Sequence, residues 1–535
     1  MVYWTASTKE INIAQSLIES ISITAEQSHS TNGGFLLTGS SVTIQLPFRP
    51  ARFYRHGWQS WSLAGWMDPS TPPLPISVPG LRNKDEDPLY ALADHHVNAW
   101  VAAVEWPDGQ VILLGALGLA GRIELDGDRL YGFYETGSGD WFLGAGSESQ
   151  VFTRYTELLG ERIGHGRVAK PPRVWCSWYS LYSLINETAL NNILRNLDSL
   201  PFDVFQVDDG WQICHGDWES NRKFPSGMAA LADKIRLTNR APGLWLAPLI
   251  VSPRSSIVKN HPDWLLHDEQ GKPVNIGQTW GGSPFALDTS HPAVLEWLDA
   301  LIRKVCGWGY GYLKLDFLYA GALPGKRCKD IPRETAYRQA LQVMRDASGD
   351  AYILACGAPI FPSLGLCDGM RVGPDVTPYW LNTPLSVYLN NPDHPSTQNA
   401  IRTSLNRLWL NPLVHTDPDV IYFRSRHTAL TLHQKSLLRD LGLISGFKAT
   451  SDLPQWLNPT ERAELREFLE SEPKVERLGR TRFRIEEREV EYADILPLLR
   501  PVKFPFGLAV FLGLYNMAVY EVLPALFAIM GERKL

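Results

Sequence analysis

Cysteine is scarce in this chain, and its spacing fits no metal site. The 535 residues include six cysteines, at positions 176, 214, 306, 328, 356 and 367, and none of them form a Cys-x-x-Cys pair. So few scattered cysteines do not make a disulfide framework for a chain of this length. The 13 histidines also lack metal-ligand spacing, and we interpret His415, near Asp417 and Asp419, as structural. We therefore expect no structural zinc site and no other metal site.

Runs of positive charge and an N-terminal targeting signal are missing as well. The formal net charge is -6, and the sequence contains no long basic run. Nucleic acid is therefore not an expected partner, because surfaces that bind it are rich in Lys and Arg. The first residues, MVYWTASTKEINIAQ, contain neither a basic segment nor a long apolar segment of the secretory kind. We expect a cytoplasmic protein.

Long apolar runs are rare, and one stretch, 507–531, is the exception. It reads GLAVFLGLYNMAVYEVLPALFAIMG and is interrupted by Asn516, Glu521 and Pro524. A polar residue, a charge and a proline in the same segment disfavour a membrane span. We expect packed strands or a buried helix here, and no membrane partner.

The distribution of strand and helix signals predicts three domains. Residues 1–165 contain apolar runs broken by Gly and Asp-Gly turns, which favours a large β-sandwich domain. Residues 170–450 alternate short apolar strands with amphipathic helices. Residues 455–535 begin with a charge-rich helix and continue as short strands, which indicates a small C-terminal β domain.

The middle domain has the strand and helix pattern of a (β/α)8 barrel. Two of its helices are predicted over 291–306, which begins at His291-Pro292, and over 332–347. The strand candidates are 174–178, 204–208, 243–248, 312–317, 352–356, 369–373, 411–415 and 441–445. A doubly wound open sheet is the alternative. No GxGxxG or GxxxxGK[ST] motif follows the first strand, so a nucleotide-binding version is disfavoured and no cofactor is expected.

Two charged residues lie inside one of these apolar strands. In YLKLDFLYAG, residues 312–321, Lys314 and Asp316 alternate with leucines and a phenylalanine. Alternate side chains of a strand point the same way, so the two charges share one face. A structural ion pair is one interpretation. The other is a catalytic carboxylate that a neighbouring cation keeps ionised.

Polar and aromatic residues recur at the ends of the predicted strands. The carboxyl ends of barrel strands meet on one face, where barrel enzymes carry their active sites. An Asp after a strand is often only a helix N-cap, yet six strands repeat the pattern. The residues concerned are Trp178, Asp208, Asp209, Trp245, Lys314, Asp316, Cys356, Arg371, Asp375, Asp417 and Asp419.

Carboxylates and indoles without a metal motif fit glycoside hydrolysis. That reaction uses two carboxyl groups that flank the anomeric carbon, and flat rings can stack on the sugar. Asp316, held ionised by Lys314, suits a nucleophile. Asp375, on a loop after Pro374, suits the protonated acid. The adjacent pair Asp208 and Asp209 suits the acceptance of sugar hydroxyls.

Six stretches, in the family's order along the chain, resemble the family-36 glycoside hydrolases, chiefly α-galactosidases. They are HGWQSWS 56–62, VDDGWQ 207–212, GLWLAP 243–248, YLKLDF 312–317, MRVGPDV 370–376 and DPDVIYFR 417–424. The resemblance implies an N-terminal β-supersandwich, a (β/α)8 barrel and a C-terminal antiparallel β domain. It implies Asp316 as nucleophile, Asp375 as acid/base, and Asp208 and Asp209 on the galactose hydroxyls. Trp178, Trp245, Lys314 and Arg371 resemble pocket residues, and Trp61 resembles one that reaches the pocket from the N-terminal domain.

The chain departs from many members of that family after the fifth strand. There it reads CGAPIFPSLGLCDG instead of a glycine-rich turn, so the role of Cys356 and its pairing with Cys367 stay open. The leading hypothesis is a retaining exo-α-galactosidase that acts on small galactosides such as melibiose or raffinose. The alternatives are an α-N-acetylgalactosaminidase, a galactosyl-transferring raffinose-type synthase and a sugar-binding pseudoenzyme. The sequence sets no oligomeric state.

Overall fold

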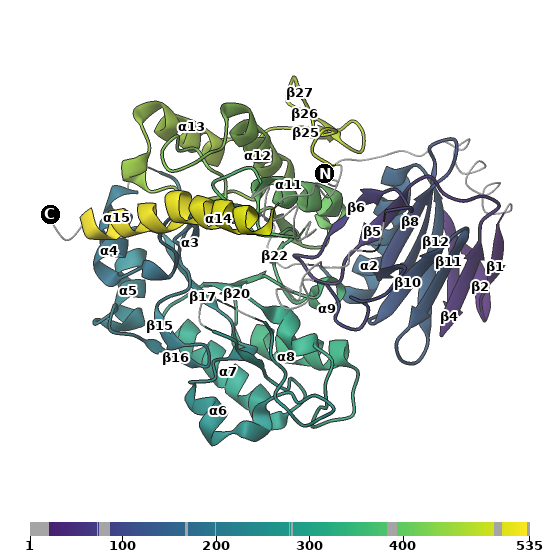
Figure 1. Cartoon of the computed structure of the whole chain (residues 1–535), viewed down its shortest axis with the longest axis horizontal. Helices are drawn as coiled ribbons and strands as arrows, with labels where there is room; N and C mark the ends of the chain where they lie inside the picture. Colours follow the sequence, from purple (N-terminus) through teal and green to yellow (C-terminus); the bar gives the residue numbers. More distant parts are fainter. Residues whose placement is uncertain are drawn as a thin grey trace.

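The protein consists of a β domain, a barrel and a C-terminal segment that ends in a long helix (Figure 1). The computed structural model describes residues 21–71, 73, 86–165, 170–197, 200–277, 279, 282–381, 393–496 and 505–531. The β domain lies at one end of the molecule, and the barrel with its helices forms the rest of it.

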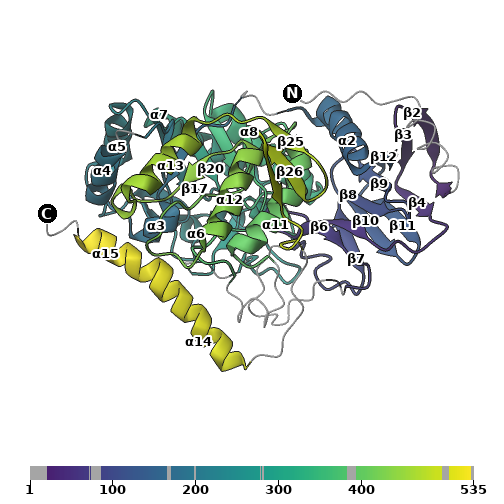
Figure 2. The same ribbon diagram turned by 90° about the horizontal axis from the view of Figure 1, so that it is seen from above.

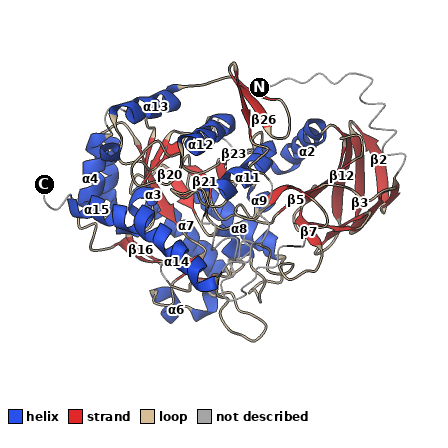
Figure 3. Cartoon of the chain, turned by 45° about the horizontal axis from the view of Figure 1, so that its top comes forward, coloured by secondary structure: helices blue, strands red, loops and turns tan. Residues whose placement is uncertain are grey.

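Two antiparallel sheets form the N-terminal domain, in agreement with the predicted β-sandwich (Figure 3). Gly132 lies where the sheets meet, because a side chain there would collide with Trp141 and Val42. One sheet has the order β1 (Ser22–Thr24), β4 (Ser41–Gln45), β11 (Arg129–Tyr134), β10 (Gly121–Asp126) and β7 (His96–Ala99). The other has the order β2 (Gln27–Thr31), β3 (Gly34–Gly39), β12 (Gly139–Gly146), β9 (Val111–Ala116), β8 (Val101–Glu105), β5 (Phe53–His56) and β6 (Ala64–Met67).

Helix α2 (Glu148–Ile163) joins the β domain to the barrel. It begins at a capping box in which Ser147 and Gln150 satisfy each other's backbone N–H groups. The Tyr155 hydroxyl donates to the carbonyl of Ala116 in β9 over 2.7 Å. On the other side, the Thr156 hydroxyl contacts the carbonyl of Trp409, which belongs to the barrel. The helix therefore fixes the two domains against each other.

The barrel is an eight-stranded parallel sheet whose strands follow one another in chain order. Such an order has no topological switch point, which excludes the doubly wound alternative. The last strand, β24, pairs with the first, β13, and the backbone N–H of Ile421, after β23, donates to the carbonyl of Ala449 in β24. The strands are β13 (Val174–Cys176), β14 (Val204–Val207), β17 (Ala241–Leu246), β20 (Tyr312–Leu315), β21 (Tyr352–Ala355), β22 (Gly369–Arg371), β23 (His415–Asp417) and β24 (Ala449–Thr450).

Helices surround this sheet (Figure 3). Two of them were predicted from the sequence, and their predicted ranges are confirmed. They are α7 (Pro292–Gly307), capped by His291, and α8 (Arg333–Ala347). The other helices are α3 (Trp178–Leu181), α4 (Glu187–Asn196), α5 (Gly227–Arg236), α6 (Ser256–Asn260), α9 (Ile360–Ser363), α11 (Thr397–Arg407) and α12 (Leu432–Ser445). Two small antiparallel sheets lie outside the barrel sheet: β15 (Gln212–Cys214) with β16 (Asp217–Ser220), and β18 (Ile250–Val251) with β19 (Phe285–Ala286).

The last two barrel strands differ from their predicted positions. The predicted strand 441–445 is the end of helix α12, and the eighth strand is β24, at Ala449–Thr450. The apolar run was misread because Leu437, Leu438 and Leu441 are spaced for a helix that ends at Gly446, which has a left-handed φ of 77°. The predicted strand 411–415 lies just before β23 (His415–Asp417).

The chain after the barrel contains less strand and more helix than predicted. Helix α13 (Pro459–Glu470) confirms the charge-rich helix, and β25 (Val475–Arg477), β26 (Arg482–Ile485) and β27 (Arg488–Glu491) form a small antiparallel sheet. The apolar stretch then forms α14 (Phe506–Met517), a π-helical turn (Ala518–Val522) and α15 (Leu523–Gly531). The expectation of packed strands or a buried helix is wrong, because large apolar side chains such as Phe511 and Phe527 are 62% and 63% exposed.

Candidate active site

The predicted polar residues gather at the carboxyl ends of the barrel strands. Asp208 follows β14, Trp245 lies in β17, and Lys314 and Asp316 lie at the end of β20. Arg371 is the last residue of β22. The parallel register aligns Trp245 of β17 with Lys314 of β20, so the side chains of neighbouring strands meet at this rim.

Lys314 pairs with Asp208 and not, as predicted, with Asp316. Its Nζ lies 3.0 Å from Oδ2 of Asp208, and both side chains are almost fully buried. Burial alone would lower the pKa of Lys314, but the carboxylate of Asp208 raises it above its ordinary value. The same Asp208 oxygen accepts from Gln206 Nε2 over 2.5 Å. The prediction failed because Asp316 lies beyond the end of the strand, where the chain turns.

Two donors fix the carboxylate of Asp316. Trp245 Nε1 donates to its Oδ2 over 2.9 Å, and the backbone N–H of Phe317 donates to its Oδ1 over 2.8 Å. Phe317 has a left-handed φ of 53°, a strained conformation for a residue with a side chain. The turn holds a buried carboxylate at the barrel rim with a fixed orientation, as a nucleophile requires.

Asp375 lies on the loop after β22 in a different electrostatic environment. Its side chain is about a third exposed, at 36%, and Arg371 Nη1 contacts its Oδ1 at 3.0 Å. Burial raises the pKa of Asp375, the nearby Asp316 raises it further, and Arg371 opposes the shift without cancelling it. A carboxyl group with a raised pKa keeps its proton to a higher pH than a free carboxyl does, as a general acid requires.

Arg371 is held in place by a network of side chains that the sequence predicted only in part. Its guanidinium contacts Oδ2 of Asp417 at 3.2 Å and Oδ1 of Asp419 at 2.8 Å, besides Asp375. Tyr179, which was not predicted, donates its hydroxyl to Asp419 and accepts from Arg371. It follows Trp178 at the end of β13, so its place at a strand end was the signal that could have found it.

Asp419 supports the loop that carries Asp375. Its Oδ2 accepts from the backbone N–H of Val376 over 2.9 Å. Asp419 itself has a left-handed φ of 82°. Burial raises the pKa of Asp419 to about 7, with Asp375 adding to the shift and Arg371 opposing it. The carboxylate of Asp419 therefore contacts both Arg371 and the loop that carries Asp375.

Asp209 and His215 form a second polar group beside Asp316. Gln212 Nε2 donates to Asp209 Oδ1 over 2.6 Å. Burial raises the pKa of Asp209 and lowers that of His215, which lies near both Asp209 and Asp316. His215 was not predicted, because no motif or spacing in the sequence marks it.

Trp61 reaches the barrel from the β domain, as the resemblance implied. Its ring lies edge-on to Phe317 at 5.4 Å between centroids. It also covers Gly357, which has a φ of 54° and where a Cβ would lie 3.0 Å from the indole. Its Nε1 is buried and has no hydrogen-bond partner among the described residues. Cys356 is buried beside Gly357, and burial raises the pKa of its thiol.

Backbone contacts hold the loop that carries Trp61 against the barrel. The N–H of Ser60 donates to the carbonyl of Ala358 over 2.9 Å. Arg407 of α11 donates to the carbonyls of Ser60 and Gln59. Because Arg407 recognises only backbone oxygens, no sequence motif could have predicted this role.

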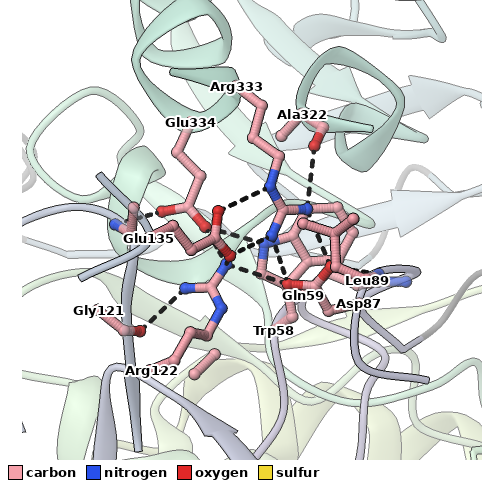
Figure 4. Close-up of polar contacts among 12 residues, drawn as sticks. Trp58, Gln59, Asp87, Leu89, Gly121, Arg122, Glu135, Ala322, Arg333 and Glu334 are labelled. Atoms are coloured by element: carbon pink, nitrogen blue, oxygen red, sulfur yellow. Dashed lines mark hydrogen bonds and ion pairs between the residues drawn. The ribbon is translucent and has the colours of Figure 1, made fainter. Parts of the chain in front are cut away.

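A buried cluster of charges fixes the same loop from the other side (Figure 4). Arg122 of β10 contacts Glu334 of α8 at 2.6 Å, and Glu334 Oε1 accepts from Trp58 Nε1. Arg333 contacts Asp87 at 2.6 Å. Glu135 contacts both arginines, at 2.9 and 2.6 Å. The cluster joins the β domain to the barrel next to Trp61.

The remaining predicted residue, Trp178, lies in α3, which contacts α15 of the C-terminal helix. Its ring lies 5.3 Å from that of Tyr182, between centroids. Glu521 of the helix accepts a 2.7 Å hydrogen bond from Tyr379, on the loop after Asp375. The C-terminal helix thus touches the loop that holds the candidate acid.

The described residues contain neither a cluster of metal ligands nor a disulfide. Among the described residues, no group of three or more His, Cys, Asp or Glu side chains could hold a metal ion. All six cysteines lie in the described part of the chain and are free, so Cys356 and Cys367 do not pair.

Comparison with known families and curated proteins identifies related enzymes. The Melibiase family model matches residues 144–347. The α-galactosidase AgaA of Geobacillus stearothermophilus is 31% identical over 208 residues, which are 36% of this chain and 27% of AgaA. Mel36A of Lactobacillus acidophilus is 31% identical over 140 residues, 24% of this chain and 19% of Mel36A. The chain is thus matched over about a quarter of these curated relatives' length.

Solved structures extend the similarity to most of the chain. TtGalA, an α-galactosidase from Thermus thermophilus solved with p-nitrophenyl α-D-galactopyranoside, is 46% identical with a TM-score of 0.85. That alignment covers 89% of this chain and 98% of TtGalA. A second TtGalA structure contains stachyose. The AgaA structure, 18% identical with a TM-score of 0.56 over 84% of this chain and 65% of AgaA, shares the fold.

Proposed function

Because the chain belongs to the melibiase family, the family-36 α-galactosidases, we propose that it hydrolyses terminal α-galactosides by a retaining, exo-acting mechanism. The observation that carries the proposal is the contrast between two carboxyl groups at the barrel rim. Asp316 is fixed by Trp245, and Asp375 has a raised pKa. Small galactosides such as melibiose and raffinose are the proposed substrates, and the stachyose and p-nitrophenyl galactoside bound to TtGalA support this class.

The first step forms a galactosyl-enzyme. A carboxylate oxygen of Asp316 attacks the anomeric carbon as the bond from that carbon to the leaving oxygen breaks. Asp375 gives its proton to the leaving oxygen. The donors on Asp316, Trp245 Nε1 and the N–H of Phe317, keep the attacking group in one orientation.

The second step reverses these roles with water. Asp375, now ionised, removes a proton from water, and the water oxygen displaces Asp316 from the anomeric carbon. Two inversions leave the product with the stereochemistry of the substrate. Arg371 contacts Asp375, so it stabilises the ionised form between the steps.

We propose that the residues around Asp208 bind the hydroxyl groups of galactose. The ammonium of Lys314 has three N–H donors, and among the described residues its one hydrogen bond is to Asp208. Asp209 is less buried than Asp208 and has an oxygen available to a hydroxyl. The unpartnered Nε1 of Trp61 is a further donor. Trp178 and Cys356 are proposed to complete the pocket wall.

Azide rescue of two variants tests the assignment of roles. Asp316→Gly should be almost inactive, and azide should restore turnover of an activated galactoside as β-galactosyl azide. Asp375→Ala should lose roughly 10²–10⁴-fold on ordinary galactosides. With a good leaving group, its intact nucleophile should yield α-galactosyl azide. The reverse pairing of products would show that the roles are exchanged, and full activity of both variants would refute the site.

A cytoplasmic location remains part of the proposal. The six free cysteines support it, because unpaired thiols are typical of reducing compartments. Fractionation of the source cells, with the activity followed in the periplasmic and cytoplasmic extracts, tests it.

A further inference from the structure

The C-terminal helix, Phe506–Gly531, carries most of the exposed large apolar side chains of the described structure. Of the 14 such residues, nine lie on this helix, and the other five are Leu89, Leu92, Ile213, Leu237 and Leu432. The nine, which we name the outer face, are Leu508, Phe511, Leu514, Tyr515, Val522, Leu523, Leu526, Phe527 and Met530. Figure 2 shows the helix along one side of the barrel, and no helix or strand of the described residues lies over its outer side.

The buried and exposed faces of this helix are the reverse of those of an ordinary surface helix in a soluble protein. Its buried positions are Ala509, Gly513, Glu521, Pro524 and Ala525, most of them small residues. A soluble amphipathic helix would turn its large apolar side chains toward the core. Small residues against protein and large apolar residues outward are typical of helices that face lipid.

The buried contact of Glu521 with the barrel argues against a membrane span for this helix. The stretch Gly507–Met530 is long and apolar enough for a span by length and composition. Glu521, however, is 9% exposed and accepts a 2.7 Å hydrogen bond from the Tyr379 hydroxyl of the barrel. A span would remove this carboxyl from its partner and bring it into hydrocarbon, which is costly. Held by Tyr379, the helix offers lipid only its outer face.

Charge near the helix favours a lipid surface over a second copy of the chain. In the sequence, Arg500 and Lys503 precede the helix, and Arg533 and Lys534 follow it, with Glu532 as the one acid in these two flanking segments. Helix-to-helix pairing of two copies brings basic ends together in either orientation. Anionic lipid headgroups instead attract them, by about 1 kcal/mol per basic residue near the surface.

We propose that the outer face of the C-terminal helix docks the enzyme in the plane of an anionic lipid surface. The apolar side chains enter the boundary between headgroups and acyl chains, and the barrel remains in water. Because Tyr379 lies on the loop after Asp375, the docked helix keeps the candidate active site close to the membrane. The inference is independent of the identity of the sugar substrate.

Vesicle flotation of the purified full chain tests the proposal. We expect the protein to float with vesicles of phosphatidylcholine and phosphatidylglycerol, and less with phosphatidylcholine alone. Phe511→Glu/Phe527→Glu should lower the partition coefficient by more than about tenfold, because two large apolar side chains leave the lipid. The control Leu237→Glu/Leu432→Glu changes leucines that are 84% and 82% exposed elsewhere, and it should float as the unaltered protein does. Circular dichroism checks that both variants fold, and hydrolysis of a nitrophenyl galactoside should be unchanged in both.

Four results would overturn the proposal. The first is that the unaltered protein floats with neither vesicle. The second is that Phe511→Glu/Phe527→Glu floats as well as the control. The third is a vesicle-free dimer in analytical ultracentrifugation that this variant dissolves, which identifies a second copy as the occupant. The fourth is membrane retention through alkaline carbonate extraction, which identifies a span.

Discussion

Nζ of Lys314 lies 3.0 Å from Oδ2 of Asp208, and the side chains are 4% and 2% exposed. The two residues come from strand ends separated by β17 in the sheet, so the pair crosses the inside of the barrel rim. Asp316, two residues after Lys314, instead accepts hydrogen bonds from Trp245 of β17 and from the backbone N–H of Phe317. The candidate site therefore contains a buried ion pair beside a separately held carboxylate.

Removing one member of this pair should destabilise the protein more than removing both charges. Lys314→Met leaves the carboxylate of Asp208 buried and unpaired, which should lower the free energy of unfolding by about 3–5 kcal/mol. Lys314→Met/Asp208→Asn should recover most of that loss but not the hydrolysis of α-galactosides. Guanidinium unfolding of the four proteins measures the coupling. Simple additivity of the two single losses would contradict the pairing.

The Asp419→Asn variant should shift the pH dependence of hydrolysis toward acid. The proposed acid, Asp375, must be protonated, so kcat/KM falls as pH rises through its raised pKa. Removing the Asp419 charge lowers the pKa of Asp375 and leaves Arg371 freer to pair with it. The basic limb of the kcat/KM profile should move to lower pH. Asp368→Asn, which breaks the buried pair with Arg345, is the matched control and should leave the limb in place.

Trp61→Phe should weaken substrate binding and leave the contact between the β domain and the barrel intact. Phenylalanine keeps a ring over Gly357 but lacks the Nε1 donor, which has no partner among the described residues. Loss of one hydrogen bond of about 0.5–1.5 kcal/mol corresponds to a rise in KM of about two- to tenfold. Steady-state kinetics measures it, with Trp66→Phe of β6 as the control from the same sheet. An unchanged KM would remove Trp61 from the proposed pocket.

Asp87 should make the interface between the domains sensitive to acid. Burial would raise the pKa of Asp87, but the guanidinium groups of Arg333 and Arg122 hold it below the ordinary value. A lowered folded-state pKa gives stability that is present above the unfolded pKa of about 3.9. That stability is lost as pH falls through the lower, folded value.

Unfolding free energies measured from about pH 5 to pH 2 test this dependence on Asp87. Asp87→Asn should flatten the decline at the acid end. Asp126→Asn should not, because Asp126 is 74% exposed in its pair with Arg129 and an exposed pair is worth about 1 kcal/mol or less. A decline of the same steepness in both variants would assign the acid sensitivity to other groups.

The sequence by itself determined the barrel and the strand ends at which the candidate residues lie. Helix α7 was predicted from His291-Pro292 and the spacing of Val294, Leu298 and Val305, because capping and apolar periodicity are local properties. Asp316 and Asp375 were predicted at one rim because parallel strands end together. The eighth strand was missed because the two-residue β24 leaves no periodic signal.

Only the tertiary structure decided which of these residues contact one another. The partner of Lys314 depends on strand register and on the turn at Phe317, and Arg407 acts through the backbone oxygens of a loop about 350 positions away in sequence. The exposure of the C-terminal helix was likewise undetermined, because an apolar segment has the same composition whether its large side chains face the core or the outside. Local patterns encode where strands and helices form, whereas pairings and exposed faces follow from packing between distant segments.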